Sequence, residues 1–159
     1  MFDVVLTPAE RALLDALTEL GVPYLIVGMS AALIEGAPGT IQDLALWFGR
    51  LDPDRLTEAA RRAGGVYTSG FGIQPPAVGG EGLDRIDIVL TASGLDSFEE
   101  EFRRAHDYEI DGLRVKVLPL ERVIVSKRAA KRTKDTAQIP MLEAALAARA
   151  DTPEEPDAG

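Results

Sequence analysis

A glycine turn is the first feature of this sequence whose residue types and spacing point to chemistry. Gly28, Met29 and Ser30 follow the apolar run at 24–27 and open a short helical stretch that Gly36 ends. The start of a helix can bind phosphate through its backbone N–H groups, and the Ser30 hydroxyl could add a hydrogen bond. Ser30 could instead cap the short helix.

Two aspartates lie in stretches with the pattern of strands. Asp43 opens the stretch 43–48, whose alternate residues are large and apolar. Asp87 lies in the middle of 84–90, where an aspartate is disfavoured unless it has a task or a partner. Asp43 is therefore either a metal ligand or a residue that begins a strand. Asp87 is either a site residue or pairs with Arg85 or a nearby lysine.

A basic segment follows in the last third of a chain whose net charge is −9. Its basic residues are Arg122, Lys127, Arg128, Lys131, Arg132 and Lys134. Lysine ammonium groups bind phosphate as point charges, so this segment could bind a phosphate group. The alternative is an amphipathic helix whose charges are solvated or paired with the acidic surface.

Together these motifs resemble the DNA polymerase beta-type nucleotidyltransferase superfamily. They are Gly28-Met29-Ser30, Asp43-Leu44-Ala45 and the segment 126–135, SKRAAKRTKD. The likeness is strongest to small bacterial members related to toxin-like and abortive-infection nucleotidyltransferases. It implies the following site: phosphates on Gly28, Ser30, Lys127 and Lys134, lysines oriented by Asp135, and Mg²⁺ or Mn²⁺ on Asp43 and Asp87.

The chain departs from the family at the second position of the Asp-X-Asp motif, which is Ala45. Residues two apart on a strand face the same way, so this motif presents two carboxylates to metal in two-metal sites. The family also commonly has a second glycine where Met29 stands. The motif is therefore degenerate, and we expect metal binding and turnover to be weakened or lost.

The resemblance implies metal-dependent transfer of a nucleoside monophosphate from a nucleoside triphosphate to a hydroxyl of RNA or protein. The alternative is an inactive binding module for a nucleotide or a protein partner, with an antitoxin-like or regulatory role and a toxin or antitoxin as partner. A third hypothesis is a globular α/β domain without a small-molecule role.

Composition excludes several classes of site. The 159 residues include no cysteine, which excludes disulfides, cysteine-zinc sites and thiol catalysis. The one histidine, His106, cannot build a histidine metal site and is expected at the surface near a helix end. We expect a cytoplasmic protein with no membrane association, because no long apolar run or signal-peptide pattern occurs. The negative charge argues against broad nucleic-acid binding and confines any RNA contact to 127–134.

The pattern predicts an α/β (α+β) domain at 1–150, a minimal nucleotidyltransferase fold with a mixed sheet of about five strands flanked by helices. We expect helices at 7–20, 29–34, 52–63, 94–105 and from 119 onward, strands at 24–27, 43–48, 66–68 and 84–90, and a hairpin at 107–118. Residues 69–83 are expected to form a mobile flap or a disordered loop. We also expect a helix break near Gln138, a solvated acidic run at 99–101, and an acidic disordered tail at 151–159.

Overall fold

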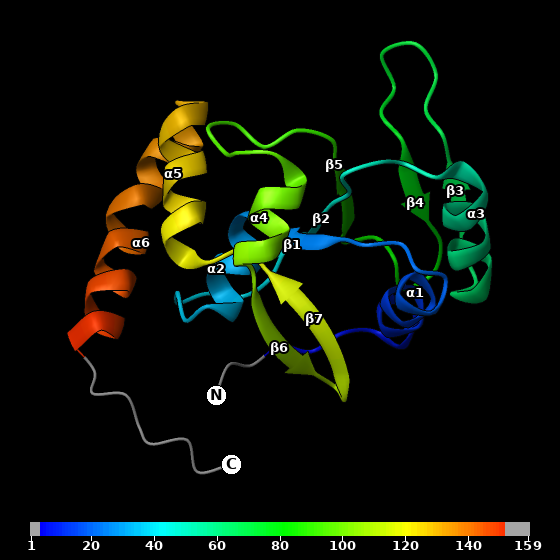
Figure 1. Cartoon of the computed structure of the whole chain (residues 1–159), viewed down its shortest axis with the longest axis horizontal. Coiled ribbons are helices and arrows are strands. Elements are labelled where there is room, and N and C mark those ends of the chain that lie inside the picture. Colours follow the sequence, from blue (N-terminus) through cyan, green and yellow to red (C-terminus); the bar gives the residue numbers. More distant parts are fainter. Residues whose placement is uncertain (1–3, 152–159) are drawn as a thin grey trace.

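The centre of the fold is β1 (Leu25–Val27), a short strand in which every residue is buried. The computed structural model describes residues 4–151 and places β1 in the middle of a five-stranded sheet of order β5-β2-β1-β7-β6 (Figure 1). The sheet is mixed: β1 runs antiparallel to β2 and parallel to β7, β2 runs parallel to β5, and β6 pairs antiparallel with β7. The predicted α+β class and five-stranded mixed sheet are confirmed.

The elements follow the chain in the predicted order, with one additional strand. The helices are α1 (Pro8–Glu19), α2 (Gly28–Ile34), α3 (Pro53–Arg62), α4 (Phe98–Arg104), α5 (Leu120–Ala130) and α6 (Thr133–Asp151). The other strands are β2 (Leu44–Trp47), β3 (Val66–Thr68), β4 (Ala77–Gly79), β5 (Ile86–Val89), β6 (His106–Ile110) and β7 (Leu113–Val117).

Capping residues set the start of α1. The Thr7 side chain accepts a hydrogen bond from the Glu10 N–H, and the Glu10 carboxylate accepts one from the Thr7 N–H, which completes a capping box. Pro8 suits the first helical position because its missing N–H would have no partner there. The buried leucines of α1 then pack into the core: Leu13, Leu14 and Leu17.

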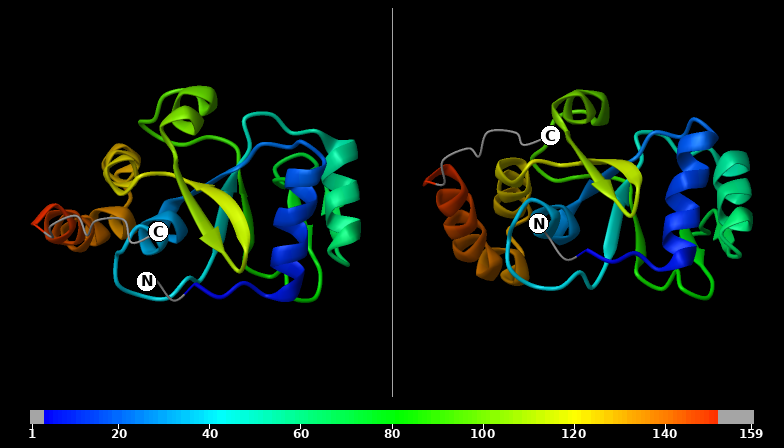
Figure 2. Two further views of the ribbon diagram at one scale, coloured as in Figure 1. Left: turned by 60° about the horizontal axis from the view of Figure 1, so that its bottom comes forward. Right: turned by 90° about the horizontal axis from the view of Figure 1, so that it is seen from below.

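Two pairs of helices lie on opposite sides of the molecule, and α2 and α4 lie between them. Figure 1 shows α1 and α3 together at one end and α5 packed on α6 at the other. The two further views in Figure 2 keep this separation. Helix α2 packs on α5, which brings the glycine turn toward the basic segment.

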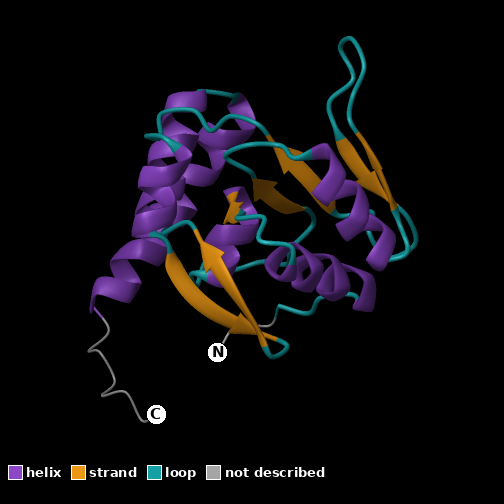
Figure 3. Ribbon diagram, turned by 45° about the vertical axis from the view of Figure 1, so that its right-hand side comes forward, coloured by secondary structure: helices purple, strands orange, loops and turns teal. Residues whose placement is uncertain are grey.

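The segment expected to be a long loop forms a β-hairpin instead. Strands β3 and β4 pair antiparallel, with Tyr67 opposite Val78 and both side chains buried. Figure 3 shows this hairpin projecting from the body of the molecule. Periodicity missed β4 because its three residues lie between prolines and glycines and offer one apolar side chain to the core.

Two helix boundaries differ from the prediction. Helix α4 begins at Phe98 rather than near Gly94, because the Ser97 side chain caps it by accepting from the Glu100 N–H. Helix α6 continues through Pro140, so the predicted break near Gln138 is wrong. Asp151 ends α6, and residues 152–159 of the predicted tail lie outside the described residues.

One prediction about charged residues is also corrected, and another is refined. Glu101, expected on a solvated face, is fully buried and pairs with Arg122 at 2.6 Å. His106 is exposed and follows the end of α4 by two residues, as expected, but it begins β6, and its Nδ1 is 2.9 Å from the buried carboxylate of Glu35. A buried carboxylate requires such a partner, and both partners are distant in sequence.

Candidate functional site

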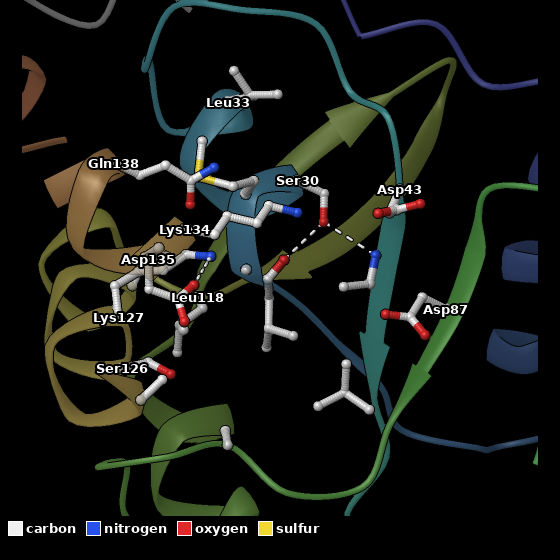
Figure 4. Close-up of a pocket in the computed structure, with 18 of the residues that line it drawn as sticks. Ser30, Leu33, Asp43, Asp87, Leu118, Ser126, Lys127, Lys134, Asp135 and Gln138 are labelled. Carbon is white, nitrogen blue, oxygen red and sulfur yellow. Dashed lines mark hydrogen bonds and ion pairs between the residues drawn. The ribbon is translucent and has the colours of Figure 1, made fainter. Parts of the chain in front are cut away.

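A pocket of about 860 Å³ lies where the sheet faces α2, α5 and the start of α6 (Figure 4). Every predicted site residue lines it: Gly28, Ser30, Asp43, Asp87, Lys127, Lys134 and Asp135. The structure thus brings together residues from four separate parts of the sequence. Their chemical roles stay predictions.

The sheet supplies an acidic wall. Ala45 of β2 is the register partner of Asp87 on the parallel strand β5, and Asp43 precedes Ala45 by two residues. Since side chains alternate along a strand, Asp43, Ala45 and Asp87 present themselves to the same side. Figure 4 shows both aspartates on this wall, with their carboxylates near each other.

Within residues 4–151, no ion pair neutralises either carboxylate of this wall. Arg85, the predicted alternative partner of Asp87, instead binds the buried Glu10 at 2.6 Å. Loss of solvent around Asp87, together with the negative charge of Asp43, raises the pKa of the Asp87 carboxyl. Among the ion pairs of the described residues none involves either aspartate, so the wall favours a cation from outside the chain.

The Ser30 hydroxyl connects the glycine turn to β2. It donates to the Val27 carbonyl at 2.7 Å and accepts from the Ala45 N–H at 3.1 Å. Ser30 is not the cap of α2, because the helix begins at Gly28 and Val27 occupies the cap position. Its one proton is already used, so its role as a hydroxyl donor to phosphate would require breaking the bond to Val27.

Gly28 is required by backbone conformation. Its φ is +62°, in the left-handed region that favours glycine, and a Cβ added there would lie 3.8 Å from the Ala45 Cβ. The turn therefore passes directly beside the position where the family motif carries its second carboxylate. Ala45 leaves that position without a charge.

Helices α5 and α6 supply a basic wall opposite. Asp135 is fully buried, and its carboxylate accepts from the Lys127 Nζ at 2.9 Å and from the Arg132 Nε at 2.6 Å. Burial alone would raise the pKa of Asp135, but its bonds to Arg132 and Lys127 outweigh burial and lower it. Asp135 is thus a buried anion that holds two cations at the pocket.

Lys134 is an exposed cation of this wall. Figure 4 shows its side chain extending across the pocket toward Ser30. In the described part of the chain no carboxylate lies within ion-pair distance of its amino group. Lys134 is therefore available for an anion, whereas Lys127 already has Asp135.

Sequence reasoning missed several side chains that line the pocket. Thr91 and Ser93 follow β5, Ser126 precedes Lys127, and Gln138 lies one helical turn beyond Lys134. The i,i+4 spacing of Lys134 and Gln138 on α6 was the signal available for Gln138, because such residues share a helix face. Because a helix break was expected near Gln138, the shared helix face of Lys134 and Gln138 was not predicted.

The donor set fits one divalent cation but not the full set of a two-metal site. Asp43 and Asp87 offer hard carboxylate oxygens, which Mg²⁺ and Mn²⁺ prefer. Within the described residues, no group of three or more histidine, cysteine or acidic side chains is placed to hold a metal ion. The missing third carboxylate corresponds to Ala45.

Comparison with solved structures identifies the fold. The chain is similar to ANT(2'')-Ia in a crystal structure with adenylyl-2''-tobramycin, at 18% identity and TM-score 0.54, covering 88% of each chain. It is also similar to the solution structure of the antibiotic-resistance factor ANT(2'')-Ia, at 19% identity and TM-score 0.55, covering 89% of this chain and 84% of the other. No protein-family model and no curated protein sequence matches the chain.

These likenesses show a nucleotidyltransferase fold. The predicted kinship with toxin-like and abortive-infection members is not supported by any of them and stays a prediction. In the region that the structure describes, no helix has the length and apolar character needed to cross a bilayer.

Proposed function

We propose that the pocket binds a nucleoside triphosphate with a divalent cation and transfers its nucleoside monophosphate slowly to a hydroxyl acceptor. One observation carries the proposal: Asp87 on β5 and Asp43 directly before β2, neither with an ion-pair partner among the described residues, face lysines of α5 and α6 across a single pocket. A metal–triphosphate complex has the matching charges, with a cation for the aspartates and phosphate oxygens for the lysines. The shared fold with ANT(2'')-Ia supports the same chemistry.

Asp43 and Asp87 would hold Mg²⁺ or Mn²⁺. When bound, the ion neutralises charge on the phosphates and polarises the phosphorus–oxygen bonds. The residues of this chain supply the positioning. Lys134 attracts the triphosphate, Asp135 fixes Lys127 beside it, and the glycine turn lines the pocket beneath the phosphates. Phosphoryl-type transfer depends chiefly on such positioning and charge stabilisation.

Asp87 is the general base in this proposal. Its carboxylate lines the pocket and has no ion-pair partner among the described residues, so it can accept a proton from a hydroxyl bound there. The acceptor hydroxyl gives its proton to Asp87, its oxygen bonds to the α-phosphorus, and pyrophosphate leaves. Ala45 lowers the rate because one carboxylate of the metal site is absent.

The acceptor in this proposal is a hydroxyl group of an RNA, a protein or a small molecule. RNA is disfavoured by the net charge of −9. The comparison structure contains an adenylylated aminoglycoside, which adds small-molecule hydroxyls to the candidates. A toxin or antitoxin partner stays a prediction from the resemblance alone.

A second function, nucleotide binding without turnover, is favoured by one specific pair of features. Ala45 removes a metal ligand, and the Met29 side chain lines the pocket where the family commonly has glycine. Both changes lower catalytic capacity and leave the basic wall intact. The two proposals differ only in whether product forms.

The binding experiment is a calorimetric titration of the full chain with ATP, GTP, CTP and UTP, with and without Mg²⁺. We expect binding that requires Mg²⁺ in the wild type and falls at least tenfold in Asp43→Asn. Asp54→Asn is the matched control, because Asp54 is exposed on α3, away from the pocket, and should bind as the wild type does. Failure of all four triphosphates to bind would refute both functions.

Turnover is tested by mixing labelled nucleoside triphosphates and Mn²⁺ or Mg²⁺ with tRNA, total protein or an aminoglycoside. We expect slow labelling by the wild type and labelling at least tenfold faster by Ala45→Asp, because the third carboxylate is restored. Binding without labelling, together with a gain of labelling in Ala45→Asp, would identify the nucleotide-binding module. A rate unchanged by Ala45→Asp would contradict the proposed metal site.

A further inference from the structure

Gln138, a half-buried residue, lines the pocket on the side away from the aspartates. It lies on α6 and lines the pocket, and its Oε1 atom is buried without a hydrogen-bond partner among the described residues. A buried carbonyl oxygen without a donor lowers stability, so native structures rarely leave one unpaired. A donor from a bound ligand would satisfy it.

The position of Gln138 relative to Lys134 narrows the choice of ligand. Residues four apart on a helix lie one above the other on the same face, so the Gln138 amide lies one turn along α6 from the Lys134 side chain. Figure 4 shows both side chains on the α6 side of the pocket, with Asp43 and Asp87 on the far side. A ligand that binds Lys134 through phosphate would therefore lie beside Gln138 on the same face of α6.

Apolar side chains of α2 and of the loop after it line the same pocket. Met29 and Leu33 of α2 and Pro38 of the following loop line it together with Gln138. Leu33 is almost fully buried, and methionine offers a polarisable surface against which aromatic rings pack favourably. We call these three residues and Gln138 the amide compartment.

We propose that the amide compartment binds the nucleobase and that Gln138 reads its Watson–Crick or Hoogsteen edge, selecting a base that presents there an exocyclic amino group beside an unprotonated ring nitrogen, as adenine and cytosine do and guanine and uracil do not. The amino group donates to the Gln138 Oε1, and the Gln138 amide N–H donates to the ring nitrogen. A glutamine amide makes this paired contact with adenine in nucleic-acid recognition. The inference rests on the proposed nucleotide binding and adds a specificity-determining residue to it.

The test compares base preference in the full chain and in Gln138→Met. Methionine keeps the length of the side chain and its helix preference but removes both hydrogen-bonding groups. With Mg²⁺ present, we expect the wild type to bind ATP and CTP about tenfold more tightly than GTP and UTP, and Gln138→Met to lose that difference. Gln74→Leu is the matched control, because Gln74 is an exposed amide on the β3–β4 hairpin and should keep the wild-type preference.

Inorganic triphosphate separates failure of this inference from failure of the proposed function. It has no base, so its affinity should be the same in the wild type and Gln138→Met and should fall in Lys134→Ala. If all four nucleotides bind the wild type equally, or if GTP and UTP bind more tightly, base reading by Gln138 is overturned while nucleotide binding stands. If neither nucleotides nor inorganic triphosphate bind, both are overturned.

A folding check accompanies the titrations. Thermal unfolding of Gln138→Met should show a single transition, and if it does not, Gln138→Ala takes its place with the same expected loss of preference. A variant that folds and keeps the preference for ATP and CTP would overturn the proposal.

Discussion

Ser30 shows how one side chain can serve both structure and site. Its hydroxyl is buried and exchanges hydrogen bonds with the Val27 carbonyl and the Ala45 N–H, which fixes the glycine turn against β2. Ser30→Ala would leave both backbone groups without these partners. We expect it to lower the free energy of unfolding by about 1–3 kcal/mol, measured by urea denaturation.

Ser69→Ala is the control for Ser30→Ala. Ser69 is exposed next to the β3–β4 hairpin, so its substitution should change the free energy of unfolding by less than about 0.5 kcal/mol. An equally small effect of Ser30→Ala would contradict the structural role. Ser30→Ala should weaken nucleotide binding only through displacement of the glycine turn, because the Ser30 hydroxyl proton is already donated to the Val27 carbonyl.

At the residue scale, local sequence located the site aspartates but not the buried carboxylates. Asp87 was recognisable because aspartate is disfavoured in the middle of a strand unless it has a functional role or a partner. Glu101 could not be recognised, since its partner Arg122 lies 21 residues away and nothing local distinguishes it from its exposed neighbours. The same holds for Glu10 and Arg85, which are 75 residues apart.

At the element scale, α6 shows tertiary structure prevailing over a local rule. Pro140 lies inside the helix, where its missing N–H leaves the Thr136 carbonyl without its intrahelical partner. The helix continues because α6 packs along α5, and the buried Asp135 and Leu142 anchor it on both sides of the proline. Packing of this kind was invisible to the local rule for proline, which placed a break near Gln138.

Pro140→Ala should therefore stabilise the protein. Alanine restores the N–H and removes the steric conflict with the preceding turn, and we expect a gain of about 1–3 kcal/mol in the free energy of unfolding. Pro53→Ala is the control: Pro53 opens α3, where no partner for its N–H is needed, so the change should bring no gain. A loss of stability in Pro140→Ala, measured by urea denaturation, would show that the proline fits this position better than alanine.

The β3–β4 hairpin marks the limit of prediction at the same scale. Two of its features were recognisable, the strand at 66–68 and the abundance of glycine and proline. Strand β4 was not, because a strand of three residues with one buried side chain has no period to detect. Its pairing depends on Val78 reaching Tyr67 across the hairpin, which only the folded chain reveals.

At the scale of the whole molecule, the fold class followed from the order of elements and the resemblance, whereas the ion pairs that connect distant elements did not. Glu35 is the main example. This carboxylate at the end of α2 bonds with Tyr108 and His106 of β6, the Leu120 N–H of α5, and Arg149 of α6. Four elements therefore meet at one anion that the sequence did not single out.

These buried carboxylates predict how the stability of the whole chain depends on pH. Burial alone would raise the pKa values of Glu35 and Glu101, but bonds from Tyr108 and His106 to the first, and from Arg122 to the second, outweigh burial and lower them. Asp135 behaves in the same way. A carboxyl whose pKa is lower in the folded than in the unfolded state contributes stability above its unfolded pKa and loses it as pH falls through its folded pKa.

We therefore expect the free energy of unfolding to be steady above about pH 5, and to fall progressively below the ordinary carboxyl pKa values of 4.5 and 3.8 as the three anions take up protons. Glu35→Gln should lower stability at pH 7 and make the decline below pH 5 shallower, since one of the three groups no longer titrates. Glu109→Gln, on the exposed side of β6, should leave both unchanged. Urea denaturation from pH 3 to pH 8 measures the curves, and equal slopes for wild type and Glu35→Gln would show that Glu35 does not couple folding to protonation.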